Sequence, residues 1–306
     1  LETFIEGASV GVIGGGKKKP TGQIDVATYQ SLINKKDNTV SSKVREYGQV
    51  IIDECHHISA PRYEMLLNEV SARYVIGLTA TPDRQDGHQK IMFMVAGPVR
   101  HKVRAEHGSK FVQRVIVRER HETPPTDIFQ NNGERPHIAS VYRWLSHSTA
   151  RNQDIVRDVV RCVQNEANCL LLTERREHAK TLATLLEAKS ISSVVLRGGM
   201  RVKERRAAES QLHEAQVIVA TGKYIGEGFD LPRLDTLFLA LPIAWKGTLS
   251  QYAGRIHRDA DGKQEVTVYD YLDNSLPMLE RMFRKREKGY KAMGYQFVSS
   301  GQTRLL

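Results

Sequence analysis

The chain has 306 residues, which is enough for two domains of ordinary size, each with its own hydrophobic core. Its 45 lysines and arginines outnumber 35 aspartates and glutamates, and the resulting formal charge of +10 favours a polyanionic partner such as nucleic acid. Three cysteines without a CxxC pair exclude a disulfide framework, and no apolar run reaches the roughly 18 residues of a membrane-spanning helix, so we expect a soluble, cytoplasmic protein.

Short apolar, β-branched runs recur along the chain, and most are followed by a polar turn and a stretch with helical spacing. The predicted strands are residues 10–13, 50–52, 74–78, 169–173, 193–196, 216–220, 237–241 and 266–269. The predicted helices of the second half are residues 152–166, 176–189 and 202–214. Continuous apolar strands that alternate with helices are typical of a parallel sheet covered on both faces, so the predicted fold class is α/β.

The alternation weakens between Pro98 and about Ala150, where residues 121–136 have the proline and asparagine content of a loop. We place the boundary between two lobes in this region. The first lobe is predicted to comprise residues 1–104 and the second residues 105–306.

The first candidate site follows predicted strand 50–52, which ends directly on two carboxylates, Asp53 and Glu54. Ligands of open α/β sheets gather at the carboxyl ends of strands. Phosphoryl transfer to water needs a hard cation and a group that orients or deprotonates the water, so Asp53 suits Mg²⁺, held through water, and Glu54 suits the base. The alternative is a helix N-terminus that Asp53 caps and at which Glu54 interacts with the helix dipole.

Two neighbouring features have alternative interpretations. Cys55, His56 and His57 have the composition of a zinc site, but adjacent side chains point in different directions and do not readily share a metal. We therefore prefer for His56 a role in coupling the nucleotide site to nucleic acid. Predicted strand 74–78 ends in Thr79 and Thr81, whose hydroxyls can bind the carboxylates or can simply belong to a Thr-Pro turn that stops the strand.

The second half carries a glycine-rich segment, from Thr221 to Asp230, and then the sequence QYAGRIHR. Glycines allow the backbone to approach a phosphate or sugar, and an acid can hold a ribose hydroxyl, although such a loop is usually only a turn. QYAGRIHR is predicted to be helical, which places Arg255 and Arg258 at i and i+3 on one face. Two guanidiniums aimed together suit the oxygens of a triphosphate, and the alternative is a solvated basic face.

The ordered set DECHH, TATP, TERREH, TGKYIGEGFD and QYAGRIHR resembles motifs II to VI of DExH-type superfamily 2 helicases. The resemblance implies two RecA-like lobes with parallel sheets, the first carrying motifs Ib to III and the second motifs IV to VI. It implies that the full-length protein uses ATP and Mg²⁺ and is a helicase or translocase that acts on nucleic acid, DNA rather than RNA. A weaker resemblance, to helicase parts of bacterial defence and primase-associated proteins, suggests a fused or associated nuclease or primase.

The resemblance also implies roles for individual residues. Those assigned to catalysis or to ATP are Asp53 (Mg²⁺ through water), Glu54 (base), Thr79 and Thr81 (coupling hydrolysis to strand movement), Gly228 (phosphates), Asp230 (ribose), Gln251, Arg255 and Arg258 (arginine finger). Those assigned to nucleic-acid contact are Thr28 and Gln30, within ATYQSL, and Thr173, Arg175 and Thr221.

Residues 11–18 superficially fit the GxxxxGK pattern of a P-loop. However, Lys18 stands where Mg²⁺ binding needs Ser or Thr, and a Thr21-Gly22 turn follows where a P-loop opens a helix. We therefore do not assign this segment as Walker A. We expect the P-loop to lie upstream of Leu1, the first lobe to be truncated at its N-terminus, and the 306-residue chain alone to be inactive. The alternative function is a non-hydrolysing nucleic-acid clamp or regulatory scaffold on a helicase fold.

Overall fold

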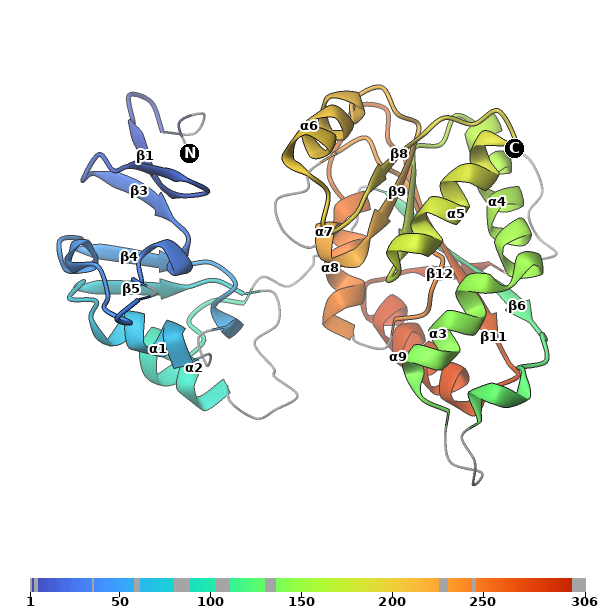
Figure 1. Cartoon of the computed structure of the whole chain (residues 1–306), viewed down its shortest axis with the longest axis horizontal. Coiled ribbons are helices and arrows are strands. Elements are labelled where there is room, and N and C mark those ends of the chain that lie inside the picture. The colour runs from blue at the N-terminus through green and yellow to red at the C-terminus, as the bar shows by residue number, and fades with distance from the viewer. Residues whose placement is uncertain are drawn as a thin grey trace. The chain divides into compact units, whose positions relative to one another are not determined.

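The computed structural model describes residues 2, 5–34, 36–57, 61–79, 89–102, 111–129, 136–225, 231–243 and 246–298. The chain divides into two compact units, Leu1–Arg104 and Ala105–Leu306 (Figure 1). No helix within the described ranges is long and apolar enough to cross a membrane.

The first unit contains two small sheets. In one, β1 (Val10–Gly14) lies between the antiparallel β2 (Lys17–Lys19) and the parallel β3 (Ile24–Ala27). In the other, β4 (Gln49–Ile52) and β5 (Tyr74–Gly77) form a parallel pair. The helical segments are α1 (Pro61–Asn68), α2 (Gln89–Ala96) and the 3-10 turns Tyr29–Ser31, Ser42–Arg45 and Cys55–His57.

The β4–β5 pair has one packed and one exposed face. Ile52 belongs to a small buried cluster with Met92 of α2, on the side where Figure 1 shows α1 and α2. On the opposite side, Ile51 is 59% exposed and its register partner Ile76 is 42% exposed. We call Ile51, Tyr74 and Ile76 the outer face of this sheet.

The second unit is built on one seven-stranded sheet, ordered β12-β6-β11-β10-β7-β9-β8, in which all pairings are parallel. Its strands are β6 (Val112–Arg120), β7 (Cys169–Thr173), β8 (Ser193–Leu196), β9 (Val217–Thr221), β10 (Thr236–Leu239), β11 (Glu265–Asp273) and β12 (Gln296–Val298). Its helices are the 3-10 turn Thr126–Ile128, α3 (Ile138–His147), α4 (Thr149–Gln164), α5 (Arg176–Glu187), α6 (Val202–Gln211), α7 (Gly222–Ile225), α8 (Lys246–Ile256) and α9 (Pro277–Ala292).

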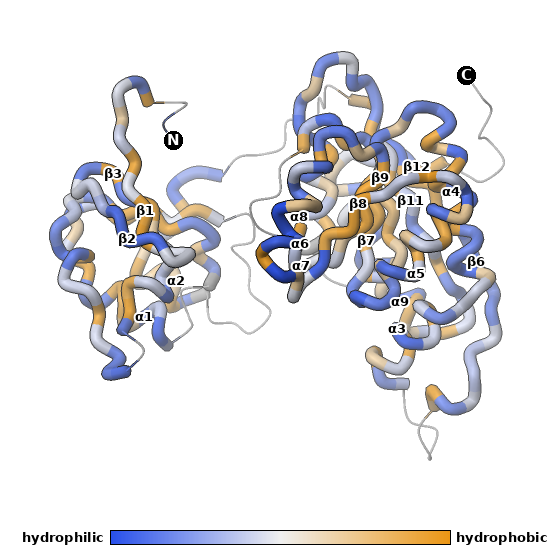
Figure 2. The backbone as a smooth tube through the Cα atoms, turned by 45° about the horizontal axis from the view of Figure 1, so that its top comes forward, coloured by the Kyte–Doolittle hydropathy of each residue, from blue (hydrophilic) through white to orange (hydrophobic). Residues whose placement is uncertain are grey.

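Both faces of the seven-stranded sheet are buried, which is why its central strands are continuous apolar runs. One face packs against α4 and α5 through residues such as Val159 and Leu182. The other face packs against α8 and α9 through residues such as Leu249 and Tyr290. Figure 2 shows the hydrophobic character concentrated along β8 and β9. The predicted α/β class with parallel sheets is confirmed.

Strand β6 was not among the predicted strands. The apolar residues Val115 and Ile116 of this strand are buried, but Arg114, Arg118 and Arg120 interrupt the pattern. Because β6 pairs with β11 in the second unit, the proline-rich loop that follows it lies inside this unit.

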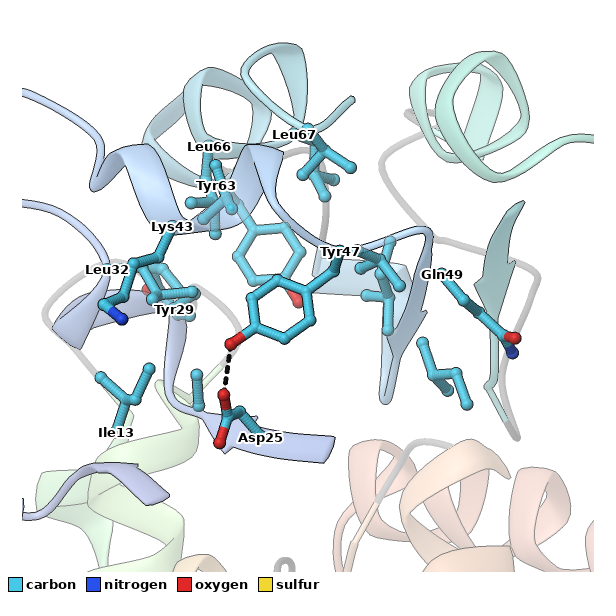
Figure 3. A pocket seen from close by; sticks show the side chains of 16 residues that line it. Ile13, Asp25, Tyr29, Leu32, Lys43, Tyr47, Gln49, Tyr63, Leu66 and Leu67 are labelled. Carbon is cyan, nitrogen blue, oxygen red and sulfur yellow. Dashed lines mark hydrogen bonds between the residues drawn. The ribbon is translucent and has the colours of Figure 1, made fainter. Parts of the chain in front are cut away.

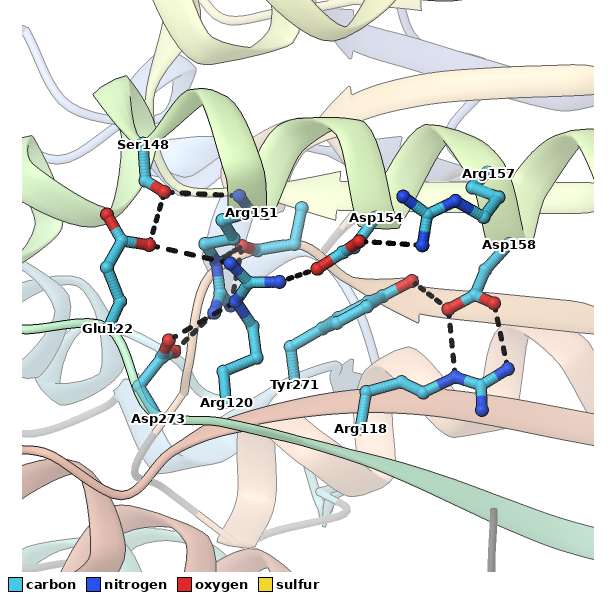
Figure 4. A network of polar contacts seen from close by, with 11 residues as sticks. Arg118, Arg120, Glu122, Ser148, Arg151, Asp154, Arg157, Asp158, Tyr271 and Asp273 are labelled. Atoms are coloured by element: carbon cyan, nitrogen blue, oxygen red, sulfur yellow. Dashed lines mark hydrogen bonds and ion pairs between the residues drawn. The ribbon is translucent and has the colours of Figure 1, made fainter. Parts of the chain in front are cut away.

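Partly buried ion pairs compensate charges of β6 and attach α4 to the sheet (Figure 4). Arg118 donates two hydrogen bonds to Asp158, at 2.8 and 3.0 Å, and Tyr271 of β11 donates to the same carboxylate at 3.1 Å. Arg151 of α4 is fully buried and pairs with Asp273. Polar side chains therefore form part of the interior between α4, β6 and β11.

Candidate functional site

Asp53 and Glu54 stand at the carboxyl end of β4. Asp53 Oδ1 accepts the backbone N–H of Glu54 at 2.9 Å, and a 3-10 turn follows instead of an α-helix capped by Asp53. Glu54 has a φ of 48°, in the left-handed region that costs a non-glycine residue about 1–3 kcal/mol. Such a conformation persists only where the surroundings impose it, and it is concentrated at functional turns.

Asp53 fits the predicted Mg²⁺ role chemically. Its side chain is exposed, and its second carboxylate oxygen has no protein partner among the residues that the structure describes. Carboxylate oxygens are ligands that Mg²⁺ prefers, and this cation usually keeps several of its waters.

His56 joins the ends of the two strands. Its Nδ1 lies 3.2 Å from Glu54 Oε2 and 3.0 Å from Thr79 Oγ1. The backbone makes a second connection, because the N–H of Cys55 donates to the carbonyl of Leu78 at 2.9 Å. The structure thus brings Glu54 and Thr79 together through one imidazole, whereas Thr81 lies outside the described residues.

A cavity of about 180 Å³ lies elsewhere in the first unit (Figure 3). Tyr47 donates a hydrogen bond to Asp25 at its wall, and this bond, with the backbone N–H of Thr21, lowers the pKa of Asp25 to about 2. Neither Asp53 nor Glu54 lines the cavity, so it is not the candidate nucleotide site.

Residues 11–18 form a hairpin. The chain turns at Gly15 and Gly16, whose φ values are 58° and 82°, and continues as the extended strand β2. A P-loop instead opens a helix whose N-terminal amides hold phosphate. The sequence-based rejection of this segment as a Walker A motif is confirmed.

Thr28 and Gln30 lie in the exposed turn that follows β3. The N–H of Thr28 donates to the carbonyl of Ile13 at 3.0 Å, and the hydroxyls of Thr28 and Ser31 lie 2.7 Å apart. Both predicted contact residues therefore present their side chains at the surface of the first unit, and their role stays a prediction.

Thr173 and Thr221, which end the adjacent strands β7 and β9, are only 2% and 6% exposed. Thr173 Oγ1 lies 2.8 Å from His178 Nδ1 and accepts the backbone N–H of Arg175 at 3.3 Å. Thr221 Oγ1 accepts the N–H of Gly198 at 3.2 Å. The Thr173 hydroxyl thus holds the turn that follows its own strand, β7, and the Thr221 hydroxyl holds the loop that follows the neighbouring strand β8. Direct contact of either with nucleic acid stays a prediction.

Arg175 and His178 complete this arrangement. The Arg175 guanidinium donates to the carbonyl of Ala139 at 2.7 Å. His178 Nε2 lies 2.9 Å from Asn152 Oδ1, and burial lowers the pKa of His178 to about 3, so its imidazole is neutral. The turn that presents Arg175 is therefore anchored on a buried, uncharged hydrogen-bond chain.

The prediction that Arg255 and Arg258 share one helical face is wrong. Helix α8 ends at Ile256, so Arg255 lies in its last turn and Arg258 lies beyond it. Between them, His257 Nε2 lies 2.7 Å from Tyr295 Oη, and the two rings stack at 5.4 Å. Burial lowers the pKa of His257 to about 4, which keeps it neutral. The helix therefore ends directly before the residue that packs against Tyr295.

Tyr252 of α8 connects three of the motifs that sequence analysis treated separately. Its hydroxyl donates to Glu174 Oε1 at 3.5 Å, and both atoms occupy the place where a Cβ at residue Gly222 would be. Gln251 lies beside it on the same helix, whereas Gly228 and Asp230 lie outside the described residues. No local sequence pattern predicts this contact.

Family models match both parts of the chain. Residues 2–84 match "Type III restriction enzyme, res subunit", and residues 151–260 match "Helicase conserved C-terminal domain".

Viral helicases are similar over most of the chain. "Probable helicase D10" of Escherichia phage T5 is 26% identical over 268 residues, which cover 87% of this chain and 57% of the relative. "Putative ATP-dependent RNA helicase L396" of Acanthamoeba polyphaga mimivirus is 24% identical over 275 residues, which cover 88% of this chain and 51% of the relative. The chain thus spans little more than half the length of these relatives.

A solved structure shares the fold. Saccharomyces cerevisiae Dbp5, bound to RNA and ADP BeF3, superposes with a TM-score of 0.60 at 11% identity, covering 95% of this chain and 70% of Dbp5. The similarity extends through both units, which correspond to two RecA-like lobes. Since family models match residues 2–84 and 151–260 and helicase relatives align over most of the chain, the chain belongs to the superfamily 2 helicases.

Proposed function

We propose that the protein is an ATP-dependent motor that moves along nucleic acid, as a helicase or translocase. The observation that carries this proposal is the contact of His56 with both Glu54 and Thr79. A motor must transmit the state of the hydrolytic site to the elements that move, and Nδ1 of this imidazole lies within 3.2 Å of both the candidate base, Glu54, and Thr79 of the TATP segment.

ATP would supply the phosphoryl group, and Mg²⁺ would neutralise charge that develops on its oxygens. Asp53 would hold the cation, as the exposure of its carboxylate allows. Glu54 accepts the proton of the attacking water, and its fixed, left-handed backbone sets the direction of the carboxylate. Arg255 and Arg258 contribute positive charge that stabilises the transition state.

We further propose that the track is DNA rather than RNA. The match of the first unit to a restriction-enzyme subunit supports DNA, whereas the names of the mimivirus relative and of Dbp5 bound to RNA point the other way. Thr28, Gln30 and Arg175 make contacts to the phosphate backbone, which position a protein without reading sequence.

The first test is Glu54→Gln in the whole protein. Loss of a general base should lower nucleic-acid-stimulated ATP turnover by roughly 10²- to 10⁴-fold and leave ATP binding largely intact. Glu46→Gln is the matched control, because Glu46 is an exposed glutamate of the same unit. Turnover is measured with duplex DNA, single-stranded DNA and RNA in parallel, so the same assay identifies the track.

The outcomes separate the hypotheses. Unchanged turnover in Glu54→Gln would exclude this residue from the chemistry. A wild-type protein that binds nucleic acid and ATP but never hydrolyses the nucleotide would instead be a clamp or scaffold on a helicase fold.

A further inference from the structure

Arg258 lies outside α8, so the helix does not fix its position. A residue that delivers charge to a reacting phosphate has to be held in place, because a displacement of about 1 Å can cost a hundredfold in rate. The question is which group holds the chain at this point.

Lys263 makes three hydrogen bonds to this region. Its Nζ donates to the carbonyls of Pro232 at 2.6 Å, Ile256 at 3.0 Å and Arg258 at 2.8 Å. A lysine ammonium has three N–H donors, and here each has a backbone acceptor. Two of these acceptors belong to Ile256, the last residue of α8, and to Arg258, two residues beyond it, where carbonyls lack helical partners.

The surroundings of the ammonium favour this arrangement. The ring of Phe111 lies beneath it, with its centroid 5.4 Å from Nζ, which adds a cation–π attraction. Burial lowers the pKa of Lys263, whereas the charges of Asp235 and Asp259 oppose that shift. The Lys263 side chain is thus held in one partly buried position, whereas the side chain of a surface lysine moves freely in solvent.

The third acceptor lies in another part of the unit. Pro232 follows shortly after the glycine-rich segment that contains Gly228 and Asp230. Lys263 therefore ties the backbone of Arg258 to that of Pro232, which precedes β10.

We propose that Lys263 is a positioning residue for ATP hydrolysis: its ammonium holds the backbone of Arg258 and fixes it relative to Pro232. This inference rests on the proposed function and adds to it a residue outside the recognised motifs. A lysine is needed because one tetrahedral ammonium converges on three carbonyls, whereas planar arginine and glutamine cannot reproduce that geometry. The competing role is a purely structural helix cap.

The first experiment measures the hold on Arg258 directly, without ATP. Trypsin cleaves after arginine, so native Lys263→Met should be cut after Arg258 several-fold faster than the wild type, with products identified by mass spectrometry. Cleavage after Arg157, whose side chain is 67% exposed on α4, should not change and serves as the internal control. If the rate of cleavage after Arg258 is unchanged, Lys263 does not hold the backbone there and the proposal is overturned.

The second experiment is a double-mutant cycle on ATP turnover in the whole protein. Lys263→Met should lower kcat on the order of 10- to 100-fold with little change in KM for ATP. Arg258→Ala should lower turnover on the order of 10³-fold, and the double variant should be no slower than Arg258→Ala, because the lysine acts through the arginine. Lys285→Met, which removes an exposed charge from α9, should match the wild type.

The two experiments distinguish the failures. Multiplicative losses in the double variant, or a loss of kcat that follows the loss of melting temperature, would make Lys263 a structural cap. If Arg258→Ala leaves turnover unchanged, the positioning role of Lys263 is overturned, whereas the proposed motor function is not. If the wild type hydrolyses no ATP, the proposed function and the role of Lys263 in it fail together. Faster tryptic cleavage of Lys263→Met would then show that Lys263 acts only as a structural cap of α8.

Discussion

At the scale of single residues, buried side chains hold the motif turns in place. Thr173 illustrates the point, because its hydroxyl is enclosed between the ring of His178 and the N–H of Arg175. A threonine in this position orients a basic turn whether or not it also contacts a phosphate. Its contribution to stability and its contribution to binding can therefore be measured separately.

Thr173→Val removes the hydroxyl and keeps the shape of the side chain. It leaves the His178 ring nitrogen and the Arg175 N–H without their partner, which should lower the free energy of unfolding by about 1–3 kcal/mol. Urea denaturation followed by tryptophan fluorescence measures this loss, since both tryptophans, Trp144 and Trp245, belong to the second unit.

Thr173→Ser should retain most of the stability, and Thr184→Val, at an exposed position of α5, should change it by no more than about 0.5 kcal/mol. A valine variant with wild-type stability but weakened nucleic-acid affinity would show instead that the hydroxyl acts on the ligand.

At the scale of elements, β4 and β5 differ from the strands of the second unit. The second-unit sheet is buried on both faces, whereas the outer face of β4–β5, formed by Ile51, Tyr74 and Ile76, is exposed among the residues that the structure describes. Exposed apolar sheet faces and unpaired strand edges promote association with other chains.

We expect the 306-residue chain to self-associate through this face. Ile51→Lys should shift sedimentation-velocity profiles towards the monomer at equal concentration, because burying a lysine in a contact costs its hydration. Val202→Lys is the matched control, since Val202 is 68% exposed on the second unit and lies on a helix. If the lysine at position 51 leaves association unchanged, another surface is responsible.

Local patterns predicted some elements and not others. The strand at Cys169–Thr173 could be predicted because both of its faces are buried, so hydrophobicity alone marks it. Strand β6 could not be predicted from its local sequence, since the residue that pairs with its Arg118 is Asp158, 40 residues away. The end of α8 could not be predicted either, because the residue that follows the helix, His257, makes its contact with Tyr295, 38 residues further on.

The residues of the candidate site likewise fall into those that a local pattern predicts and those that only the tertiary structure reveals. The rule that ligands gather at strand ends located Asp53, Glu54 and Thr79, because it needs only the positions of strands. It could not locate Lys263, whose three acceptors are brought together by the fold. Motif order identified the family, and the tertiary contacts identify the residues that hold the motifs.

At the scale of the whole molecule, stability should depend on pH through two buried histidines of the second unit. The pKa of His178 is lowered to about 3 and that of His257 to about 4, in both cases chiefly by burial. Below about pH 6.5 the unfolded chain binds protons that the folded unit does not, so stability is lost as pH falls.

Between pH 7.5 and 5.5, each histidine should lower the free energy of unfolding by about 1.4 kcal/mol. Tryptophan-monitored urea denaturation at the two pH values measures the sum, and this window lies above the usual titration range of carboxylates. His257→Phe keeps a stacked ring and removes one titration, so about half of the pH effect should remain. Equal midpoints at both pH values would contradict the buried, neutral state of these rings.

The place of β6 in the sheet has a consequence for synthesis on the ribosome. Val112 of β6 pairs with Glu265 of β11, roughly 150 residues later. At about 5–20 residues per second, β6 emerges some 8–30 s before its partner. Strands β7 to β10 can pair with one another in that interval, whereas β6 bonds only to β11 and β12. The arginines of β6, which interrupt its apolar pattern, should keep this segment hydrated until β11 and β12 have been synthesised.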